Sequence, residues 1–220
     1  MNANAAMLNT IPLFQSLSQP QLASVGAHVA WRVYEKGDIV VHQGEVADSL
    51  FVIASGQVKV YMTEGDREVI LKTLSAGDFF GELPMLDMEP RSASVAAIER
   101  CHLQLLSYKA LQRAMEGSPD IAKRVLETLA KRLRDADRKI STLALMDISA
   151  RVSRTLLELA ILSNGRMVVG EPYTQKDLAG MVGASREMVN RTLQDLQHAG
   201  YIDVQRKSIT ILDENLPTRY

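Results

Sequence analysis

Residues 77–97 read GDFFGELPMLDMEPRSASVAA, and Gly81, Glu82, Arg91 and Ser92 in this stretch combine the chemistry needed to hold a sugar phosphate. The guanidinium of Arg91 can neutralise a fixed phosphate anion, with the Ser92 hydroxyl as a further donor. The carboxylate of Glu82 can accept from a ribose hydroxyl, and Gly81 has no Cβ to keep the backbone away from the sugar. The stretch therefore predicts a ligand-binding loop. The alternative is a surface hairpin in which Glu82 and Arg91 simply form an ion pair.

The sequence around this loop predicts a β-roll. Between residues 31 and 107, short runs rich in Val, Ile, Phe and Tyr are separated by glycines. The clearest runs are 39–42, 50–53, 58–62 and 68–74. Short strands with glycine turns at near-even spacing indicate an antiparallel roll or jelly roll whose interior can take one small ligand.

A heptad pattern follows the β-rich region. Apolar residues recur three and four positions apart at Leu126, Leu129, Leu133, Ala136, Ile140 and Leu143. Charged residues flank this narrow stripe, so the pattern predicts one long helix that forms a parallel homodimer. The alternative is an amphipathic helix lying on its own domain. The stripe is interrupted at residues 145–148, where we place a hinge, and Asp147 is predicted to cap a second helix that runs to about residue 163.

Residues 174–196 read TQKDLAGMVGASREMVNRTLQDL, which predicts two helices joined at a glycine turn. Helical spacing places Arg186, Glu187, Asn190 and Arg191 on the outer face of the second helix. In a DNA major groove, arginine can hold guanine O6 and N7, and glutamate can accept from cytosine N4. Further candidate DNA contacts are Thr174 and Ser185, at the two helix N-termini, and Lys176. Residues 200–211 predict a β-wing. The alternative to DNA reading is that the polar face of the second helix is simply solvated.

Nearly the whole chain resembles the cyclic-AMP receptor protein/FNR superfamily of bacterial transcription regulators. The loop matches that family's phosphate-binding cassette at Gly81, Glu82, Leu83, Arg91, Ser92 and Ala93, and the pattern Ser185-Arg186-Glu187-x-x-x-Arg191 is similar to its recognition helix. The resemblance implies an α+β fold. It comprises an N-terminal antiparallel β-roll sensor (1–118), a long central dimerisation helix with a hinge (119–146) and a C-terminal winged helix-turn-helix (147–220).

The same resemblance implies a function. A cyclic nucleotide, cyclic AMP first, would bind between the β-roll and the central helix and control binding to a palindrome with TGTGA-like half-sites. Arg186 and Arg191 would contact guanines and Glu187 a cytosine. RNA polymerase would be a partner, and no prosthetic group is implied.

The chain departs from the family at the positions that read the nucleotide base. A threonine and a serine contact the adenine in the family's cyclic-AMP receptor protein, and the matching residues are Ala136 and Asp137. A carboxylate can accept from both N1–H and N2–H of guanine, so cyclic GMP and cyclic di-GMP are alternative effectors. Asp137 can instead pair with Arg134, or with Arg138 of the facing chain. Constitutive DNA binding with a vestigial pocket is a further alternative.

Composition limits the other function classes. The chain has 220 residues and one cysteine, which predicts two domains and a reducing, cytoplasmic location. The first 120 residues hold 9 basic and 14 acidic residues and the last 100 hold 16 and 12, so the C-terminal part can approach phosphates. The four histidines lack metal-ligand spacing, and no apolar run is long enough to span a membrane. The sequence shows no nucleophile–base arrangement that would suggest an enzyme. A nucleotide-binding regulatory subunit that does not bind DNA is the other alternative to a DNA-binding regulator.

Overall fold

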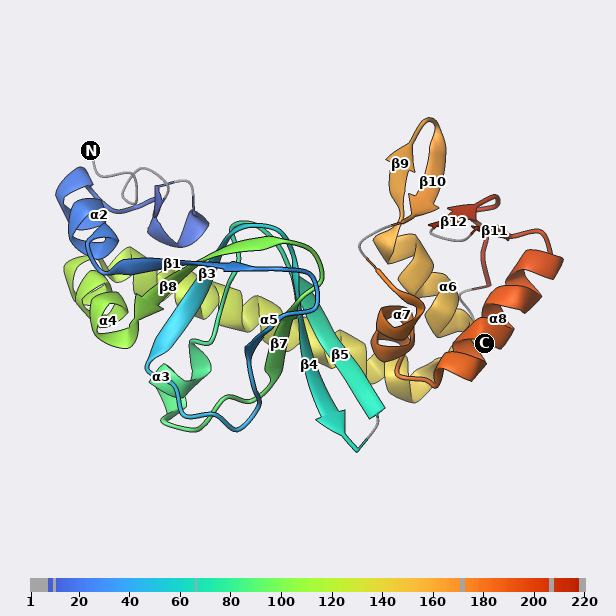
Figure 1. The fold of residues 1–220 in the computed structure, drawn as a ribbon, viewed down its shortest axis with the longest axis horizontal. Coiled ribbons are helices and arrows are strands. Elements are labelled where there is room, and N and C mark those ends of the chain that lie inside the picture. Colours follow the sequence, from blue (N-terminus) through green and yellow to red (C-terminus); the bar gives the residue numbers. More distant parts are fainter. Residues whose placement is uncertain (1–7, 10, 66, 171–172, 206–207, 218–220) are drawn as a thin grey trace. The chain divides into compact units, whose positions relative to one another are not determined.

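The computed structural model describes residues 8–9, 11–65, 67–170, 173–205 and 208–217. It confirms the α+β fold class, with antiparallel sheets, a long central helix and a C-terminal helix-turn-helix (Figure 1). The chain divides into two compact units, residues 1–62 with 72–134 and residues 63–71 with 135–220. The domain boundaries at residues 118 and 146 stay predictions.

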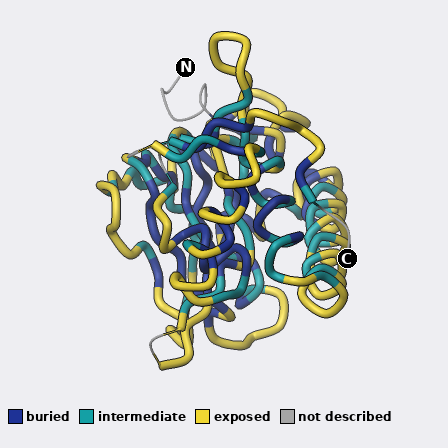
Figure 2. Tube along the Cα trace, turned by 90° about the vertical axis from the view of Figure 1, so that its right-hand side faces the viewer, coloured by how far each residue is buried: buried dark blue, intermediate teal, exposed yellow. Residues whose placement is uncertain are grey.

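Two four-stranded antiparallel sheets form the β-roll, with strand orders β1-β8-β3-β6 and β2-β7-β4-β5. The strands are β1 (Val29–Tyr34), β2 (Ile39–Val41), β3 (Ser49–Ser55), β4 (Val58–Glu64), β5 (Arg67–Leu74), β6 (Phe79–Phe80), β7 (Ser94–Ala97) and β8 (Cys101–Ser107). Side chains alternate along β3, so that Phe51 and Ile53 join the core that both sheets share, whereas Leu50 and Val52 join a cluster on the other face. Both faces of this strand are therefore buried. Figure 2 shows that the buried segments of the chain lie inside a layer of exposed loops.

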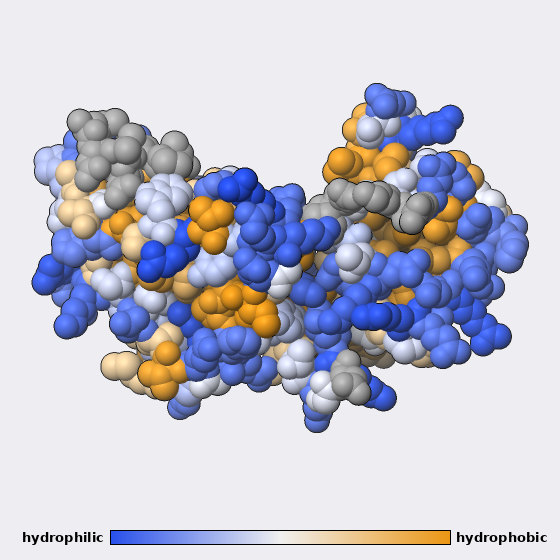
Figure 3. All heavy atoms as spheres, viewed as in Figure 1, coloured by the Kyte–Doolittle hydropathy of each residue, from blue (hydrophilic) through white to orange (hydrophobic). Residues whose placement is uncertain are grey.

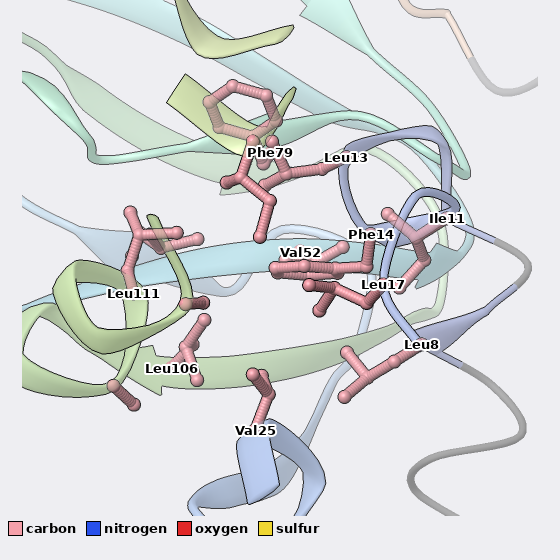
Figure 4. Packing of buried hydrophobic residues seen from close by; sticks show 14 of the residues in the cluster. Leu8, Ile11, Leu13, Phe14, Leu17, Val25, Val52, Phe79, Leu106 and Leu111 are labelled. Atoms are coloured by element: carbon pink, nitrogen blue, oxygen red, sulfur yellow. The ribbon is translucent and has the colours of Figure 1, made fainter. Parts of the chain in front are cut away.

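The N-terminal segment and several short helices accompany the β-roll. The short elements are η1 (Pro12–Phe14), α2 (Gln19–Gly26), α3 (Leu83–Asp87) and α4 (Tyr108–Gly117). Ile11 and Phe14 pack in one hydrophobic cluster with Val52 of β3 and Leu106 of β8 (Figure 4). This cluster seals the outer face of the sheet that contains β3 and β8.

The central helix α5 (Pro119–Leu145) has 27 residues and is about 40 Å long. Its first turns are fixed to the first unit, because Ile121 and Val125 are buried in the same hydrophobic cluster as Ile11 and Phe14. Leu126, Leu133 and Ile140 recur at intervals of seven and are 66%, 65% and 64% exposed. Much of the apolar stripe expected from the sequence is thus uncovered in the single chain, whereas Leu129 is partly buried against the cluster that contains Ile11 and Phe14.

The second unit carries the helix-turn-helix and its wing. Its elements after α5 are α6 (Ile148–Leu159), β9 (Ile161–Ser163), β10 (Arg166–Val169), α7 (Gln175–Val182), α8 (Arg186–His198), β11 (Ile202–Gln205) and β12 (Ser208–Ile211). The four strands form one antiparallel sheet in the order β11-β12-β10-β9. Asp147 caps α6 by accepting a hydrogen bond from the Ala150 amide at 2.8 Å, as predicted.

The predicted extent of α6 to residue 163 is wrong. The helix ends at Leu159, and β9 pairs with β10 across a turn at Asn164 and Gly165, whose φ angles are 50° and 76°. Two consecutive positive φ angles are typical of a tight hairpin, and pairing with β10 takes the preceding residues out of the helix. Hydrophobic atoms are visible over this hairpin (Figure 3), where Ile161 and Leu162 are largely exposed.

Candidate functional site

The Arg91 side chain is fixed in place inside the first unit. It is 6% exposed, and its guanidinium donates hydrogen bonds to the carbonyl oxygens of Gly81 at 3.0 Å and Ser49 at 2.8 Å. The same group lies 5.8 Å from the centre of the Phe51 ring. These contacts orient the cation before a ligand arrives.

Gly81 makes room for this guanidinium. Its φ is 85°, in the region that favours glycine, and a Cβ at this position would collide with Nη1 of Arg91 and lie 3.1 Å from its Cζ. The Tyr108 hydroxyl donates to the Gly81 carbonyl oxygen at 2.7 Å. Burial raises the pKa of Tyr108, so the phenol remains protonated and can act as this donor. The loop backbone is therefore held from two sides.

Glu82 is 2% exposed and has one carboxylate oxygen engaged and one unused. Its Oε1 pairs with Arg132 of α5, whose guanidinium also donates to the Phe79 carbonyl and lies 4.9 Å from the centre of the Phe79 ring. Its Oε2 is buried and has no hydrogen-bond partner among the residues that the structure describes. The surface ion pair between Glu82 and Arg91, the alternative interpretation of the sequence, is not formed, because Glu82 pairs with Arg132.

One cavity brings the predicted loop residues together. Its volume is about 60 Å³, and it is lined by Val41, Val60, Lys72, Phe80, Gly81, Glu82, Leu83, Pro84, Arg91, Ser92, Ala93, Val95 and Arg132. Three of these residues are cationic and one is anionic, so the lining carries two excess positive charges. Such a lining suits a phosphate-bearing ligand.

Arg132 and Lys72 are lining residues that sequence reasoning missed. In the heptad pattern Arg132 is one of several cations that flank the apolar stripe, and nothing local distinguishes it from the others. Only the fold brings residue 132 to residue 82. Ala136 and Asp137 are exposed on α5, and the neighbouring Arg138 pairs with Asp135. The role of Ala136 and Asp137 in reading a base stays a prediction.

The helix-turn-helix consists of α7, a turn at Gly183 and α8. Gly183 has a φ of 69°, and a Cβ there would lie 2.9 Å from Cδ2 of Leu143 on α5. Thr174 and Asp177 form a capping box at the start of α7, and Ser185 caps α8 by accepting from the Met188 amide at 3.2 Å. These caps are placed where the sequence predicts both helices to begin.

The two faces of α8 differ as the spacing predicts. Val189, Leu193 and Leu196 are buried in the core of the second unit. Arg186, Glu187 and Arg191 are exposed, and Asn190 is partly exposed. The amino group of Lys176 on α7 lies 3.2 Å from a carboxylate oxygen of Glu68. The DNA contacts assigned to these residues, and to Thr174 and Ser185, stay predictions.

Two cations hold the C-terminal end of α7. Lys139 of α5 donates to the Met181 carbonyl, and Arg151 of α6 donates to the Val182 carbonyl at 2.8 Å. Burial lowers the pKa of Lys139. The last carbonyls of a helix carry partial negative charge, so both contacts stabilise the end of the helix that precedes the turn.

The single cysteine lies in the hydrophobic core of the β-roll. Cys101 is fully buried, and its single S–H proton is shared between the carbonyl oxygens of Gln57 and Glu99, which lie 3.1 Å and 3.2 Å from Sγ. Burial raises the pKa of this thiol, which keeps it protonated. Among the residues described, no group of three or more His, Cys, Asp or Glu side chains could hold a metal ion. In the same residues, no helix combines the length and apolar character needed to cross a membrane.

Comparison with known proteins identifies the family. Residues 31–118 match the model of the cyclic nucleotide-binding domain, and residues 150–216 match that of the Crp-like helix-turn-helix domain. A CRP-like cAMP-activated global transcriptional regulator of Mycobacterium tuberculosis (strain H37Rv) is 33% identical over 206 residues, which cover 91% of this chain and 92% of that protein. The chain belongs to the CRP/FNR family.

Other members of the CRP/FNR family are similar over most of their length. The cAMP-activated global transcriptional regulator CRP of Salmonella typhimurium is 32% identical over 202 residues, or 88% of this chain and 95% of that protein. The c-di-GMP-responsive global regulator CLP of Xanthomonas campestris has a solved structure with a TM-score of 0.78 and 31% identity, covering 89% of this chain and 100% of that chain. This chain is therefore a cyclic-nucleotide-binding transcription regulator with a DNA-binding helix-turn-helix domain.

Proposed function

We propose that this regulator is a homodimer whose binding to a palindromic DNA site is controlled by a cyclic nucleotide, with cyclic AMP as the first candidate. The observation that carries the proposal is the unused, buried Oε2 of Glu82, in the same cavity as the fixed guanidinium of Arg91. A cyclic nucleotide offers a hydroxyl donor for the carboxylate and an anion for the guanidinium. It acts by binding alone, without a catalytic step or a prosthetic group.

Arg132 is the proposed link between the ligand and the central helix. Its guanidinium pairs with the Glu82 carboxylate and lines a cavity of about 60 Å³. This volume is small for a nucleotide. In the proposed mechanism the sugar hydroxyl donates a hydrogen bond to the Glu82 carboxylate. Arg132 then leaves this carboxylate and moves toward the phosphate. The resulting shift in α5 changes the balance between two states, by no more than the ligand's preference for one of them.

The exposed stripe of α5 is proposed to form the dimer interface, through Leu126, Leu129, Leu133, Ala136, Ile140 and Leu143. The dimer would set two copies of α8 one DNA turn apart, with TGTGA-like half-sites. Arg186 and Arg191 then contact guanines, Glu187 contacts a cytosine, and Thr174, Lys176, Ser185 and Asn190 support these contacts. RNA polymerase is the proposed partner on DNA.

Fluorescence anisotropy tests this proposal. A labelled TGTGA-N6-TCACA duplex is titrated with the protein at fixed salt, alone and with cyclic AMP, cyclic GMP or cyclic di-GMP, because phosphate contacts make the affinity salt-dependent. We expect one nucleotide to tighten binding in the wild type and in Arg100→Ala, a control in an exposed ion pair with Glu35. The Arg91→Ala variant should lose the response. Equal, tight binding in every condition would mean constitutive DNA binding instead.

A cyclic dinucleotide is the second candidate effector. The cavity lining contains Lys72, Arg91 and Arg132 against Glu82 alone, which matches a dianion better than a monoanion. The similar regulator CLP responds to c-di-GMP. Direct calorimetric titration of the three nucleotides into the same protein preparation distinguishes these effectors.

A further inference from the structure

The last turns of α5 pack on the end of α7, within the second unit. Lys139 of α5 donates a hydrogen bond to the Met181 carbonyl oxygen, and Leu143, four residues further along the same face, lies against the turn at Gly183. Gly183 permits this approach, because a Cβ there would lie only 2.9 Å from Cδ2 of Leu143. The end of the long helix therefore contacts the helix-turn-helix directly (Figure 1).

These contacts lie on both sides of the hinge between α5 and α6. The helix α5 ends at Leu145, and α6 begins at Ile148. After the hinge, Arg151 donates to the Val182 carbonyl at 2.8 Å, and before it Lys139 donates to the preceding carbonyl of α7. Two consecutive carbonyls are thus held, one from each side of the hinge. The end of α7 turns about the hinge only if a hydrogen bond from a cationic donor breaks.

Lys139 differs from another lysine on the flank of the apolar stripe. Lys131, two turns earlier, is exposed, as expected for a charge that flanks a heptad seam. Lys139 is partly buried, and burial lowers the pKa of its amino group. Its hydration is replaced by a carbonyl at the C-terminal end of α7, where the helix carries partial negative charge. Lys139 therefore has a defined protein partner.

The position of α7 relative to α5 determines where the reading helix lies. The helices α7 and α8 share one core, in which Val182 packs with Val189 and Leu193, so α8 follows any movement of α7. Each base pair inserted between two half-sites separates them by about 3.4 Å and turns them by about 35° around the DNA axis. A reading helix fixed to α5 fits one such arrangement, whereas one joined only through the hinge can follow several.

We propose that Lys139 is a positioning residue, which fixes the helix-turn-helix to α5 so that the dimer selects one spacing between its DNA half-sites. The inference rests on the proposed homodimer and palindrome, and it names the residue that sets their geometry. Leu143 belongs to the stripe proposed as the dimer interface, so the turn at Gly183 lies beside that interface. A tilt of α7 would move both copies of α8, because a two-fold dimer repeats every shift.

Competition anisotropy of the full-length protein tests this role. The duplexes are TGTGA-N5-TCACA, TGTGA-N6-TCACA and TGTGA-N7-TCACA, each with and without cyclic AMP. A duplex with a single half-site reports binding that needs no spacing. Lys139→Met keeps an apolar stem and removes the donor, whereas Lys139→Arg keeps a cationic donor. The control is Lys131→Met, at the exposed lysine of the same helix.

We expect the wild type to prefer one spacing by at least about tenfold and Lys139→Met by less than about threefold, because the variant loses a hydrogen bond from a charged donor. Lys139→Arg and Lys131→Met should keep the preference. Affinity for the single half-site should stay within about twofold of the wild type. A merely structural role would weaken binding to every duplex equally, and this result overturns the proposal. A wild type without a spacing preference also overturns it.

Hydrogen exchange of the protein without DNA, followed by NMR, separates this inference from the proposed function. The Met146 amide donates to the Thr142 carbonyl at 3.1 Å, where α5 meets the hinge. We expect this amide to exchange at least about fivefold faster in Lys139→Met than in the wild type or Lys131→Met, since loss of the contact favours local opening. Equal exchange rates overturn the proposal. If the wild type bound none of the duplexes, the proposed palindrome would be wrong, and the exchange rates would still show whether Lys139 holds the hinge.

Discussion

Replacing Gly81 with alanine tests whether the position of the Arg91 guanidinium determines the affinity for the nucleotide. The change adds one methyl group, which would collide with Nη1 of Arg91, and it forces alanine to adopt a φ of 85°. The guanidinium must then leave the Gly81 and Ser49 carbonyls, which it contacts at 3.0 and 2.8 Å. Gly37→Ala is a matched control, because Gly37 has a φ of 96° and nothing within 4 Å of the added Cβ.

Both variants place an alanine in left-handed backbone, but only Gly81→Ala also breaks the hydrogen bonds of Arg91. Left-handed backbone costs an alanine about 1–2 kcal/mol, so Gly37→Ala should lower the free energy of unfolding by about that amount. Each hydrogen bond to a charged group contributes about 1.5–3 kcal/mol and Arg91 would lose two, so Gly81→Ala should lose about 4–8 kcal/mol in total. If Arg91 no longer meets the phosphate, the same 1.5–3 kcal/mol corresponds to nucleotide binding weakened by about 10- to 150-fold.

Urea unfolding and calorimetric titration with the effector measure both quantities. Gly37→Ala should bind the nucleotide like the wild type, despite its lower stability. The reasoning is refuted if Gly81→Ala binds as tightly as Gly37→Ala, since the position of Arg91 would then be irrelevant to the ligand. Equal unfolding free energies of the two variants would refute the steric part alone.

Three further predictions concern the dimer, the DNA and the thiol. Leu133→Glu places a charge in the exposed stripe and should produce monomers in sedimentation velocity, whereas Lys131→Glu on the flank should remain dimeric; a dimeric Leu133→Glu would contradict the proposed interface. Glu187→Ala should relax the preference at one base pair by about 1–3 kcal/mol in competition assays, and uniform weakening on all sequences would argue against base reading. Burial raises the pKa of Cys101, so its reaction with iodoacetamide at pH 8 should be much slower than that of the urea-unfolded protein; equal rates would show that the thiol is accessible.

Much of the fold is predictable from short-range patterns in this sequence. Strand runs separated by glycines predict the β-roll, and the heptad spacing predicts α5 with its largely uncovered stripe. The capping residues Thr174 and Ser185 predict where α7 and α8 begin. These features depend on neighbours within a few residues, for which periodicity and capping rules are informative. The end of α6 was mispredicted because pairing between β9 and β10 competes with the helix for residues 161–163.

By itself the sequence determined the residue types of the nucleotide loop, the apolar stripe of the long helix and the polar face of α8. Only the tertiary structure decided that Arg132 engages Glu82, 50 residues away, and that one carboxylate oxygen remains unused. It also decided that Gln104, on a strand among apolar residues, is fully buried with an unsatisfied amide. The reason is physical: burial and hydrogen-bond satisfaction depend on which distant segments the fold brings together, whereas periodicity and local backbone preferences are written into adjacent residues.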